Sequence, residues 1–224
     1  MDRRNRLNGF FTVVTVLRLK GWVLLDSIDY YNKYANLYFE STVELDMGEI
    51  LDKFTGYLPE GGEILDLGCG SGRDSLNLIQ RGFDVTAIDG SKELCELASI
   101  HIGQDVLHMQ FSELDFDEVF DGIWACASLL HIAPDEFEEI FGKVIKCLKP
   151  GGVLYMSFKH GEFSGFRSGR YFNDFRTKEM KDIINKFAEL KILEIWKTPD
   201  VRNEHGEEVW LNVLVKKIDD EKQV

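Results

Sequence analysis

The chain has 224 residues, of which 44% are hydrophobic, and these values fit one domain with a sizeable core, or one domain with a small lid. Its formal net charge of −13 argues against a general phosphate-binding surface, because nucleic-acid affinity depends largely on Lys and Arg, although a local basic groove is not excluded. The four cysteines include no Cys-x-x-Cys pair and the five histidines show no metal-ligand spacing, so we predict no metal site and a reducing, cytoplasmic location.

Residues 1–28 are the part of the chain with the least clear pattern. Three arginines precede the apolar run 10–17, which superficially resembles a signal peptide. Two basic residues soon follow the run, no small-residue cleavage site comes after it, and it is shorter than the roughly 20 apolar residues that a membrane span needs. We therefore expect a loosely packed extension, and a peripheral membrane or partner contact stays open as the alternative.

Two helices are predicted before the first strand. Residues 29–40 carry tyrosines at helical spacing, namely Tyr30 or Tyr31, Tyr34 and Tyr38. An amphipathic helix that simply rests on the core would explain this spacing. Residues 43–55 form the second predicted helix, and the segment 57–62 contains the Pro and Gly residues of a turn.

A glycine-rich turn follows the first predicted strand, Ile64–Leu67. Three glycines then alternate with other residues before the polar start of a helix: Gly68, Gly70 and Gly72. Such an order of strand, glycine turn and helix is typical of the ligand-binding end of a βα unit, where glycine permits unusual backbone angles and close approach of a ligand. No Gly-Lys-Ser/Thr follows, which argues against a phosphate-binding P-loop.

A second apolar run, Val85–Asp89, ends in a carboxylate about 20 residues after the turn, the spacing expected for recognition of ribose hydroxyls. A carboxylate can accept charge-assisted hydrogen bonds from both vicinal hydroxyls. A plain glycine turn with Asp89 as an ordinary helix cap is the alternative. The occurrence of both features at the correct separation favours nucleotide-type binding.

These residues resemble the class I S-adenosylmethionine-dependent methyltransferases. The first motif matches as Asp66-x-Gly-x-Gly-x-Gly72 and the second as Ala87-Ile-Asp-Gly-Ser91. Two further stretches fit, residues 120–131 and 148–157. The resemblance covers roughly residues 30–217, and its motifs are specific for the family but almost silent on the substrate.

The resemblance implies an α/β fold: a doubly wound, seven-stranded, mostly parallel sheet with an antiparallel terminal hairpin, in a domain over residues 29–218 and with a frayed tail over 219–224. It implies S-adenosyl-L-methionine as the cofactor. The residues that it places at the cofactor are Tyr34, Asp66, Gly68, Cys69, Gly70, Gly72, Asp89, Gly90, Ser91, Gln110, Phe111 and Ala125.

One of these positions departs from the family pattern. Many relatives have an acidic residue near the end of the third strand, predicted here over residues 106–110, where it meets the adenine amino group. This chain has Gln110, whose amide oxygen can accept the same hydrogen bond. Phe111 could pack on adenine or belong to the core, and both interpretations stay open.

The fourth predicted strand, residues 121–127, ends in small residues and is followed by His131. Ligands of doubly wound sheets bind at the carboxyl ends of strands, so this loop should face the transferred methyl group. His131 is the best candidate for a general base, because its unperturbed pKa lies near 6.5. A histidine that only orders the loop by hydrogen bonding is the alternative.

The rest of the chain completes the sheet. A helix is predicted from Pro134, then a strand over 152–158, a helix capped by Thr177, and two strands over 191–198 and 208–217. The segment 159–172 is predicted to be a mobile substrate lid, because it is rich in glycine and basic residues, and its arginines would suit a carboxylate or phosphate. A solvated loop without a role is the alternative.

The sequence thus predicts an enzyme that transfers a methyl group to an O, N or S nucleophile of a small molecule. Three alternatives remain: a transfer-RNA or protein methyltransferase, an NAD-type oxidoreductase, and a non-catalytic cofactor-binding module. The acidic charge counts against nucleic acid, and the lack of a second domain favours a small acceptor. No membrane partner is expected apart from the possible contact of the first residues, and the oligomeric state stays open.

Overall fold

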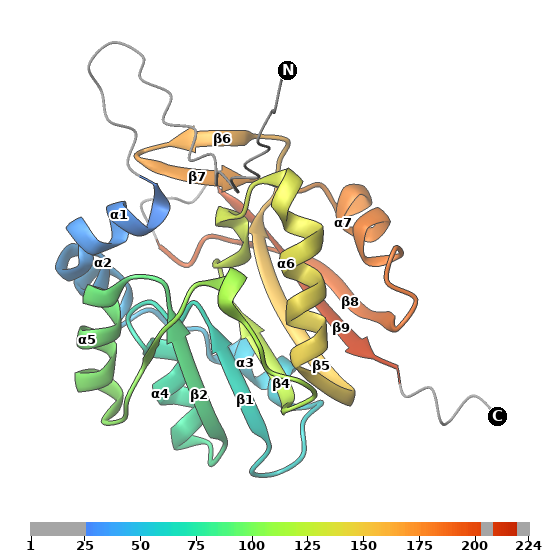
Figure 1. The fold of residues 1–224 in the computed structure, drawn as a ribbon, viewed down its shortest axis with the longest axis horizontal. Coiled ribbons are helices and arrows are strands. Elements are labelled where there is room, and N and C mark those ends of the chain that lie inside the picture. The colour runs from blue at the N-terminus through green and yellow to red at the C-terminus, as the bar shows by residue number, and fades with distance from the viewer. Residues whose placement is uncertain (1–25, 203–207, 219–224) are drawn as a thin grey trace, which may run out of the picture.

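The computed structural model describes residues 26–202 and 208–218, which fold around one seven-stranded sheet (Figure 1). The strands lie side by side in the order β3 (Leu107–His108), β2 (Asp84–Asp89), β1 (Glu63–Leu67), β4 (Phe120–Ala125), β5 (Leu148–Lys159), β9 (Val209–Lys217) and β8 (Leu190–Pro199). The first five are parallel to one another, whereas β9 is antiparallel to both of its neighbours. This arrangement confirms the predicted fold class.

Helices cover both faces of the sheet. Figure 1 shows α6 in front of the sheet and α3 behind the sheet. The α-helices are α1 (Ser27–Lys33), α2 (Ala35–Thr42), α3 (Gly48–Thr55), α4 (Arg73–Gln80), α5 (Lys92–Ile102), α6 (Pro134–Cys147) and α7 (Thr177–Ile184). Two short 3₁₀ helices, η1 (Phe111–Glu113) and η2 (Leu129–His131), follow β3 and β4. The helix predicted to be capped by Thr177 instead has Arg176 as its N-cap, and the backbone N–H of Arg176 donates to Glu179 Oε2.

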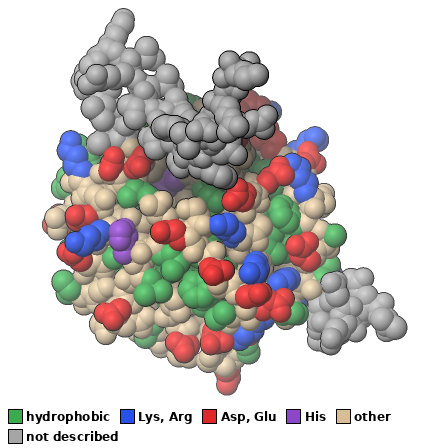
Figure 2. Space-filling model, in the orientation of Figure 1, with side chains coloured by type: hydrophobic (Ala, Val, Ile, Leu, Met, Phe, Trp, Pro, Cys, Tyr) green, Lys and Arg blue, Asp and Glu red, His purple; other side chains and the backbone are tan. Residues whose placement is uncertain are grey.

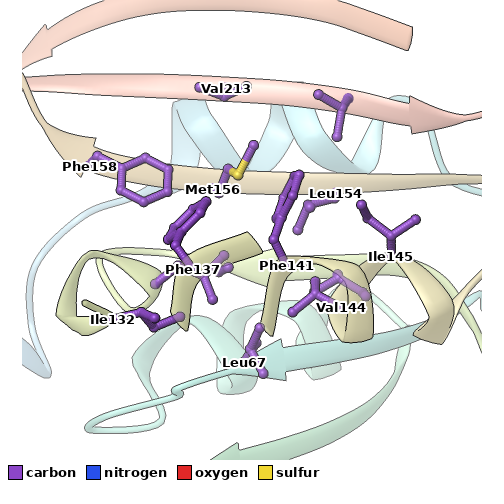
Figure 3. Packing of buried hydrophobic residues seen from close by; sticks show 14 of the residues in the cluster. Leu67, Ile132, Phe137, Phe141, Val144, Ile145, Leu154, Met156, Phe158 and Val213 are labelled. Carbon is purple, nitrogen blue, oxygen red and sulfur yellow. The ribbon is translucent and has the colours of Figure 1, made fainter. Parts of the chain in front are cut away.

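The core is divided between the two faces by the alternation of side chains along the central strands. Ile123 of β4 packs in the cluster under α6, while its neighbour Trp124 packs in the cluster under α3. Figure 3 shows Phe137 and Phe141 of α6 lying against Met156 of β5. These central parallel strands are buried on both faces, and their carboxyl ends form one rigid edge on which a site can be built.

Two predicted segments have a different structure. The helix predicted over 29–40 is broken into α1 and α2 at Tyr34, whose backbone angles of −114° and 21° are not helical. The helix predicted over 43–55 begins only at Gly48, where Asp46 Oδ1 accepts a hydrogen bond from the Gly48 N–H at 2.8 Å. Both changes shorten the predicted helices, and α3 packs on one face of the sheet through Leu51 and Phe54.

The predicted lid is a β-hairpin, formed by β6 (Ser164–Arg167) and β7 (Arg170–Asn173). Its two-residue turn, Ser168-Gly169, has φ angles of 52° and 82°, and a positive φ at both positions is the type I′ geometry that suits the twist of paired strands. The hairpin lies at the same end of the molecule as α1 (Figure 1), and the Tyr171 N–H donates to Ser27 Oγ at 3.0 Å. The segment is therefore ordered and joined to the first helix.

The predictions for the two ends of the chain lie mostly outside the described residues. Residues 1–25 and 219–224 are not described, while α1 begins at Ser27, inside the segment predicted as an extension. Within the described ranges, no helix has the length and apolar content to cross a membrane. On the face shown in Figure 2, Lys and Arg side chains are scattered among Asp and Glu side chains.

Candidate functional site

The glycine turn and Asp89 meet at the carboxyl edge of the sheet. Because β1 and β2 are parallel with Leu67 beside Ile88, both strands end at the same edge. The Gly70 N–H donates to Asp89 Oδ2 at 2.9 Å, and the Ser91 N–H donates to Asp89 Oδ1 at 2.8 Å. Each carboxylate oxygen keeps a further lone pair for a ligand hydroxyl. The sequence prediction that these two features form one site is consistent with this geometry.

The three glycines of the turn adopt backbone angles that other residues rarely adopt, with φ of 79° at Gly68, 57° at Gly70 and 76° at Gly72. A Cβ atom at Gly68 would lie 2.6 Å from Ser128 Cβ, and one at Gly70 would lie 3.1 Å from the Tyr38 ring. The turn therefore needs glycine both for its conformation and for the close approach of neighbouring segments.

A network of hydrogen bonds among largely buried polar side chains lies next to the turn. Asp66 accepts a hydrogen bond from Ser75 Oγ at 2.5 Å, and Asp74 accepts one from Trp124 Nε1 at 2.8 Å. Arg73 forms two hydrogen bonds with Asp74, each of 2.7 Å. Burial, reinforced by the Asp74 carboxylate, raises the pKa of Asp66 to about 8. Asp66 is therefore mostly protonated near pH 7.

The first helix covers the Asp89 end of the turn. The Ile28 side chain lies within 3.2 Å of where a Gly90 Cβ would be, and Ser91 Oγ donates to Asn32 Oδ1 at 2.8 Å. Asp89 is only 9% exposed beneath this cover. Burial also raises the pKa of Asp89, while the hydrogen bonds from the Ser91 and Gly70 N–H groups oppose that shift.

Two cavities open beside the turn. The smaller, of about 30 Å³, is lined by the turn itself and by Asp66. The larger, of about 210 Å³, lies beyond the ends of β4 and β5 and is covered by the β6–β7 hairpin. Their walls share Tyr38, Thr42, Arg73 and Cys126. A ligand on the glycine turn would therefore adjoin a second ligand in the larger cavity.

The predicted site residues do not all lie at these cavities. Asp66, Gly68 and Cys69 line the smaller one, and His131 lines the larger one. Burial raises the pKa of the Cys69 thiol well above its usual value, which keeps it neutral at the turn. The rest of the predicted set lines neither cavity: Tyr34, Gly70, Gly72, Asp89, Gly90, Ser91, Gln110, Phe111 and Ala125.

The members of that set have different surroundings. Ala125 ends β4 and is fully buried in the core under α6. Gln110 is exposed, and Phe111 packs against the same core while its ring lies 3.3 Å from where a Gly68 Cβ would be. The centre of the Tyr34 ring lies 4.7 Å from that of the Tyr30 ring, with the two planes tilted by 48°. The cofactor role predicted for Tyr34 stays a prediction.

His131 has partners at both ring nitrogens. Its Nδ1 lies 2.6 Å from the Tyr171 carbonyl oxygen, which can only accept, so Nδ1 carries the proton. Its Nε2 then accepts from the Tyr31 hydroxyl at 2.9 Å. Burial lowers the pKa of His131 to about 4, so the ring is neutral near pH 7. A base that acts directly on a substrate would first have to release Tyr31.

The sequence prediction missed several residues of the cavity wall. Tyr31 and Tyr38 face it, whereas only Tyr34 was chosen from the tyrosines at helical spacing. Arg73, next to the glycine turn, lines both cavities. Ser128 Oγ is buried beside Gly68 without a hydrogen-bond partner, and only its place after β4 could have indicated it.

Comparison with known proteins finds a match to a methyltransferase domain in part of the chain. Residues 64–152 match the family model described as "Methyltransferase domain". YqeM of Bacillus subtilis (strain 168), provisionally assigned as a methyltransferase, is 33% identical over 143 residues, which cover 59% of this chain and 58% of that protein. Over residues 64–152 the chain thus matches a methyltransferase domain, and the motifs that resemble the class I S-adenosylmethionine-dependent methyltransferases lie in or beside this segment. The match spans little more than half of the length of YqeM, so the activity of YqeM is not assigned to this chain.

Solved structures share the fold of this chain. The 1,6-didemethyltoxoflavin-N1-methyltransferase of Burkholderia thailandensis, solved with 1,6-didemethyltoxoflavin and S-adenosylhomocysteine bound, superposes with a TM-score of 0.69 at 22% identity, over 86% of this chain and 85% of that one. The [4+2]-cyclase SpnF superposes with a TM-score of 0.66 at 16% identity, over 87% and 97%. These likenesses concern the fold, and they include a protein named for a different reaction.

The residues at the turn fit the family's cofactor, S-adenosylmethionine. Glycine at positions 68 and 70 leaves the backbone open to close approach, and Asp89 retains acceptor capacity for hydroxyl groups. The unpartnered Ser128 hydroxyl adds a buried polar group that a ligand could satisfy. In the described ranges, no three His, Cys, Asp or Glu side chains gather into a possible metal site.

Proposed function

We propose that the chain is a methyltransferase that passes a methyl group from S-adenosylmethionine to an O, N or S nucleophile of a small molecule. The observation that carries this proposal is the larger cavity, which shares four wall residues with the cavity at the glycine turn. Donor and acceptor would thus lie side by side, and alignment of two reactants is a main source of rate in such transfers. The bound cofactor supplies an electrophilic methyl group on a cationic sulfur.

The cofactor would lie along the carboxyl edge of β1 and β2. In this proposal Asp89 accepts hydrogen bonds from the ribose hydroxyls, while Gly68, Gly70 and Gly72 keep the backbone open. Gly90 and Ser91 flank the ribose, and the predicted roles of Gln110 and Phe111 at the adenine end are retained. Ala125, predicted to leave room near the transferred methyl group, is fully buried and would act only as a small residue beneath the site. Because α1 covers Asp89, binding there requires this short helix, which has no fully buried residue, to shift.

The size of the larger cavity favours a small acceptor. Its volume of about 210 Å³ lies below the roughly 300 Å³ at which pockets for drug-sized ligands begin. Tyr31, Tyr155 and Phe172 give it aromatic walls suited to a planar ring. A small acceptor and reduced cysteines agree with a cytoplasmic enzyme built as a single domain over residues 29–218.

An acceptor that must lose a proton would pass it to the Tyr31–His131 pair. The Tyr31 hydroxyl reaches the cavity and already donates to His131 Nε2. In this proposal His131 keeps its catalytic assignment but receives the proton through Tyr31. Its lowered pKa makes it a weak base, which suits an acceptor whose own nucleophile ionises readily.

The test is formation of S-adenosylhomocysteine from S-adenosylmethionine across a panel of phenols, amines and thiols, with the Asp89→Ala variant as the control. We expect product with at least one class and none with the variant. Absence of product with every class, while S-adenosylhomocysteine still binds, would favour the non-catalytic binding module. The test must include this outcome because SpnF, which shares the fold, is named for a cyclisation and not for a methyl transfer.

A further inference from the structure

Basic side chains gather on the wall of the larger cavity, although the chain as a whole is acidic. Among the described residues, the Lys and Arg side chains on this wall are Arg73, Lys159, Arg167, Arg170 and Arg202. Four of them form ion pairs with carboxylates: Arg73 with Asp74, Lys159 with Glu208, Arg167 with Asp174, and Arg202 with Asp200. Arg170 forms no ion pair with any carboxylate in the described part of the chain.

Arg170 is half-buried, and its Nε is shielded from water. Its guanidinium carbon lies 4.7 Å from the centre of the Tyr30 ring and 5.1 Å from that of Phe172, so aromatic faces hold it on two sides. Its Nη1 donates to the Tyr31 hydroxyl at 3.3 Å. Its Nε is buried and has no hydrogen-bond partner. A charged donor left unsatisfied in this way is costly unless a ligand completes it.

Arg167 provides an internal comparison within the same hairpin. It lies directly opposite Arg170 across the β6–β7 pair, and its guanidinium also stacks on Phe172, at 4.6 Å. The Arg167 Nη2 atom lies 3.0 Å from Asp174 Oδ1, and this ion pair neutralises the Arg167 charge. Two arginines thus share one strand register and one aromatic ring, but only one of them has its charge satisfied by the protein.

We infer that Arg170 receives the carboxylate of an aromatic methyl acceptor. The Nε–H and a terminal N–H of a guanidinium form a fork that matches the two oxygens of a carboxylate, and Arg170 leaves this fork without a partner. Because Nε is buried and Tyr30 of α1 lies over the guanidinium, the acceptor reaches the fork with the same shift of α1 that cofactor binding requires. The aromatic walls fit a planar ring carrying that group. The inference deepens the proposed function and rests on it, since the ligand is the acceptor of the same reaction.

The structure allows a matched test in calorimetric titrations with S-adenosylhomocysteine present at saturation. The probes are para-aminobenzoate and para-hydroxybenzoate, each compared with its primary amide, which has the same shape without the charge. We expect the wild-type protein to bind at least one carboxylate about tenfold or more tightly than its amide. Arg170→Gln should abolish that preference and Arg170→Lys should weaken it, because lysine keeps the charge but loses the fork.

Arg167→Gln is the control, since it removes the same charge from the same hairpin, and it should change the preference by less than about threefold. Titration of S-adenosylhomocysteine alone gives a separate result for each protein. If the wild type fails to bind it, the proposed function fails. Equal loss of carboxylate preference in both glutamine variants would overturn the inference, as would wild-type protein that binds no carboxylate probe or does not prefer it to the amide. Loss of S-adenosylhomocysteine affinity in Arg170→Gln alone would assign Arg170 to the cofactor's own carboxylate and likewise overturn it.

Discussion

The glycine turn and the hairpin-covered cavity are built in opposite ways. The turn is a continuous segment in which backbone angles and backbone N–H groups define the site, and its ionisable groups are mainly the buried carboxylates of Asp66, Asp74 and Asp89. The cavity is assembled by side chains from separate helices, strands and loops, and among its described Lys and Arg side chains only Arg170 has no carboxylate partner. Asp66 is mostly protonated near pH 7 and Arg73 pairs with Asp74, so Asp89 is the acidic group of the turn that remains for a cationic cofactor. In the cavity, Arg170 is the guanidinium that remains for an anionic acceptor.

This difference indicates how each region should respond to substitution. A site made by backbone tolerates no added atoms, so single methyl groups should have large effects there. A site made by side chains should lose individual contacts one at a time.

Gly68→Ala should have the largest effect. The new methyl group would lie 2.6 Å from Ser128 Cβ at a φ of 79°, and left-handed backbone plus overpacking should together cost about 2–5 kcal/mol of unfolding free energy. Binding of S-adenosylhomocysteine should be lost as well. Denaturant unfolding and calorimetry measure the two effects.

Gly82→Ala is the matched control, because Gly82 has a φ of 90° but no atom within 4 Å of its potential Cβ. This substitution should lower the free energy of unfolding by only about 1–2 kcal/mol, the effect of the left-handed backbone alone, and should leave S-adenosylhomocysteine binding unchanged. Equal effects of the two substitutions on binding would show that space at the turn is unimportant.

Asp89→Asn should weaken S-adenosylhomocysteine binding by about 10- to 100-fold, the usual value of hydrogen bonds to a charged group. The amide can still accept one backbone N–H, so the fold should survive. Asp84→Asn, at the exposed start of the same strand, serves as the control. Comparable affinity for both variants in calorimetry would contradict the role proposed for Asp89.

Asp66→Asn should alter the pH dependence of stability. Because the folded pKa of about 8 lies above the ordinary value of 3.8, protonated Asp66 favours the fold, and its contribution is lost as pH rises toward and through 8. The melting temperature of the ligand-free protein should therefore fall from pH 6 to pH 9. The asparagine variant, whose amide oxygen still accepts from Ser75, should show a smaller fall. Parallel profiles in differential scanning fluorimetry would refute the raised pKa.

Tyr31→Phe should have the smallest effect. It removes the hydroxyl that joins Arg170 to His131 and should cost about 1 kcal/mol of unfolding free energy, the usual net value of a hydrogen bond. Tyr30→Phe keeps a similar ring beside Arg170 and serves as the control. Urea unfolding of both variants measures the difference, and identical midpoints would argue against the Tyr31–His131 contact.

The sequence allowed the backbone-built region to be predicted, because its information is local. Parallel strands must bring their carboxyl ends to one edge, so the end of β1 and Asp89 could be placed together without a structure. The hairpin was predicted as a lid loop because glycine and basic residues dominate the segment, although Ser168-Gly169 forms a two-residue β-turn.

The side-chain-built region was less predictable, because its contacts join residues that are distant in sequence. Tyr31 and His131 are separated by 100 positions, and no periodic pattern links them. The same limit applies to the two hairpin arginines. Composition treats Arg167 and Arg170 alike, whereas only the fold shows that Asp174 neutralises the first.

The central claim is that the edge formed by the glycine turn and Asp89 binds the cofactor of the family. The most direct measurement is a titration of the wild-type protein with S-adenosylhomocysteine and, in parallel, with NADH, which the alternative oxidoreductase would require. The account predicts micromolar binding of S-adenosylhomocysteine and no binding of NADH. Saturable NADH binding without any heat from S-adenosylhomocysteine would contradict it.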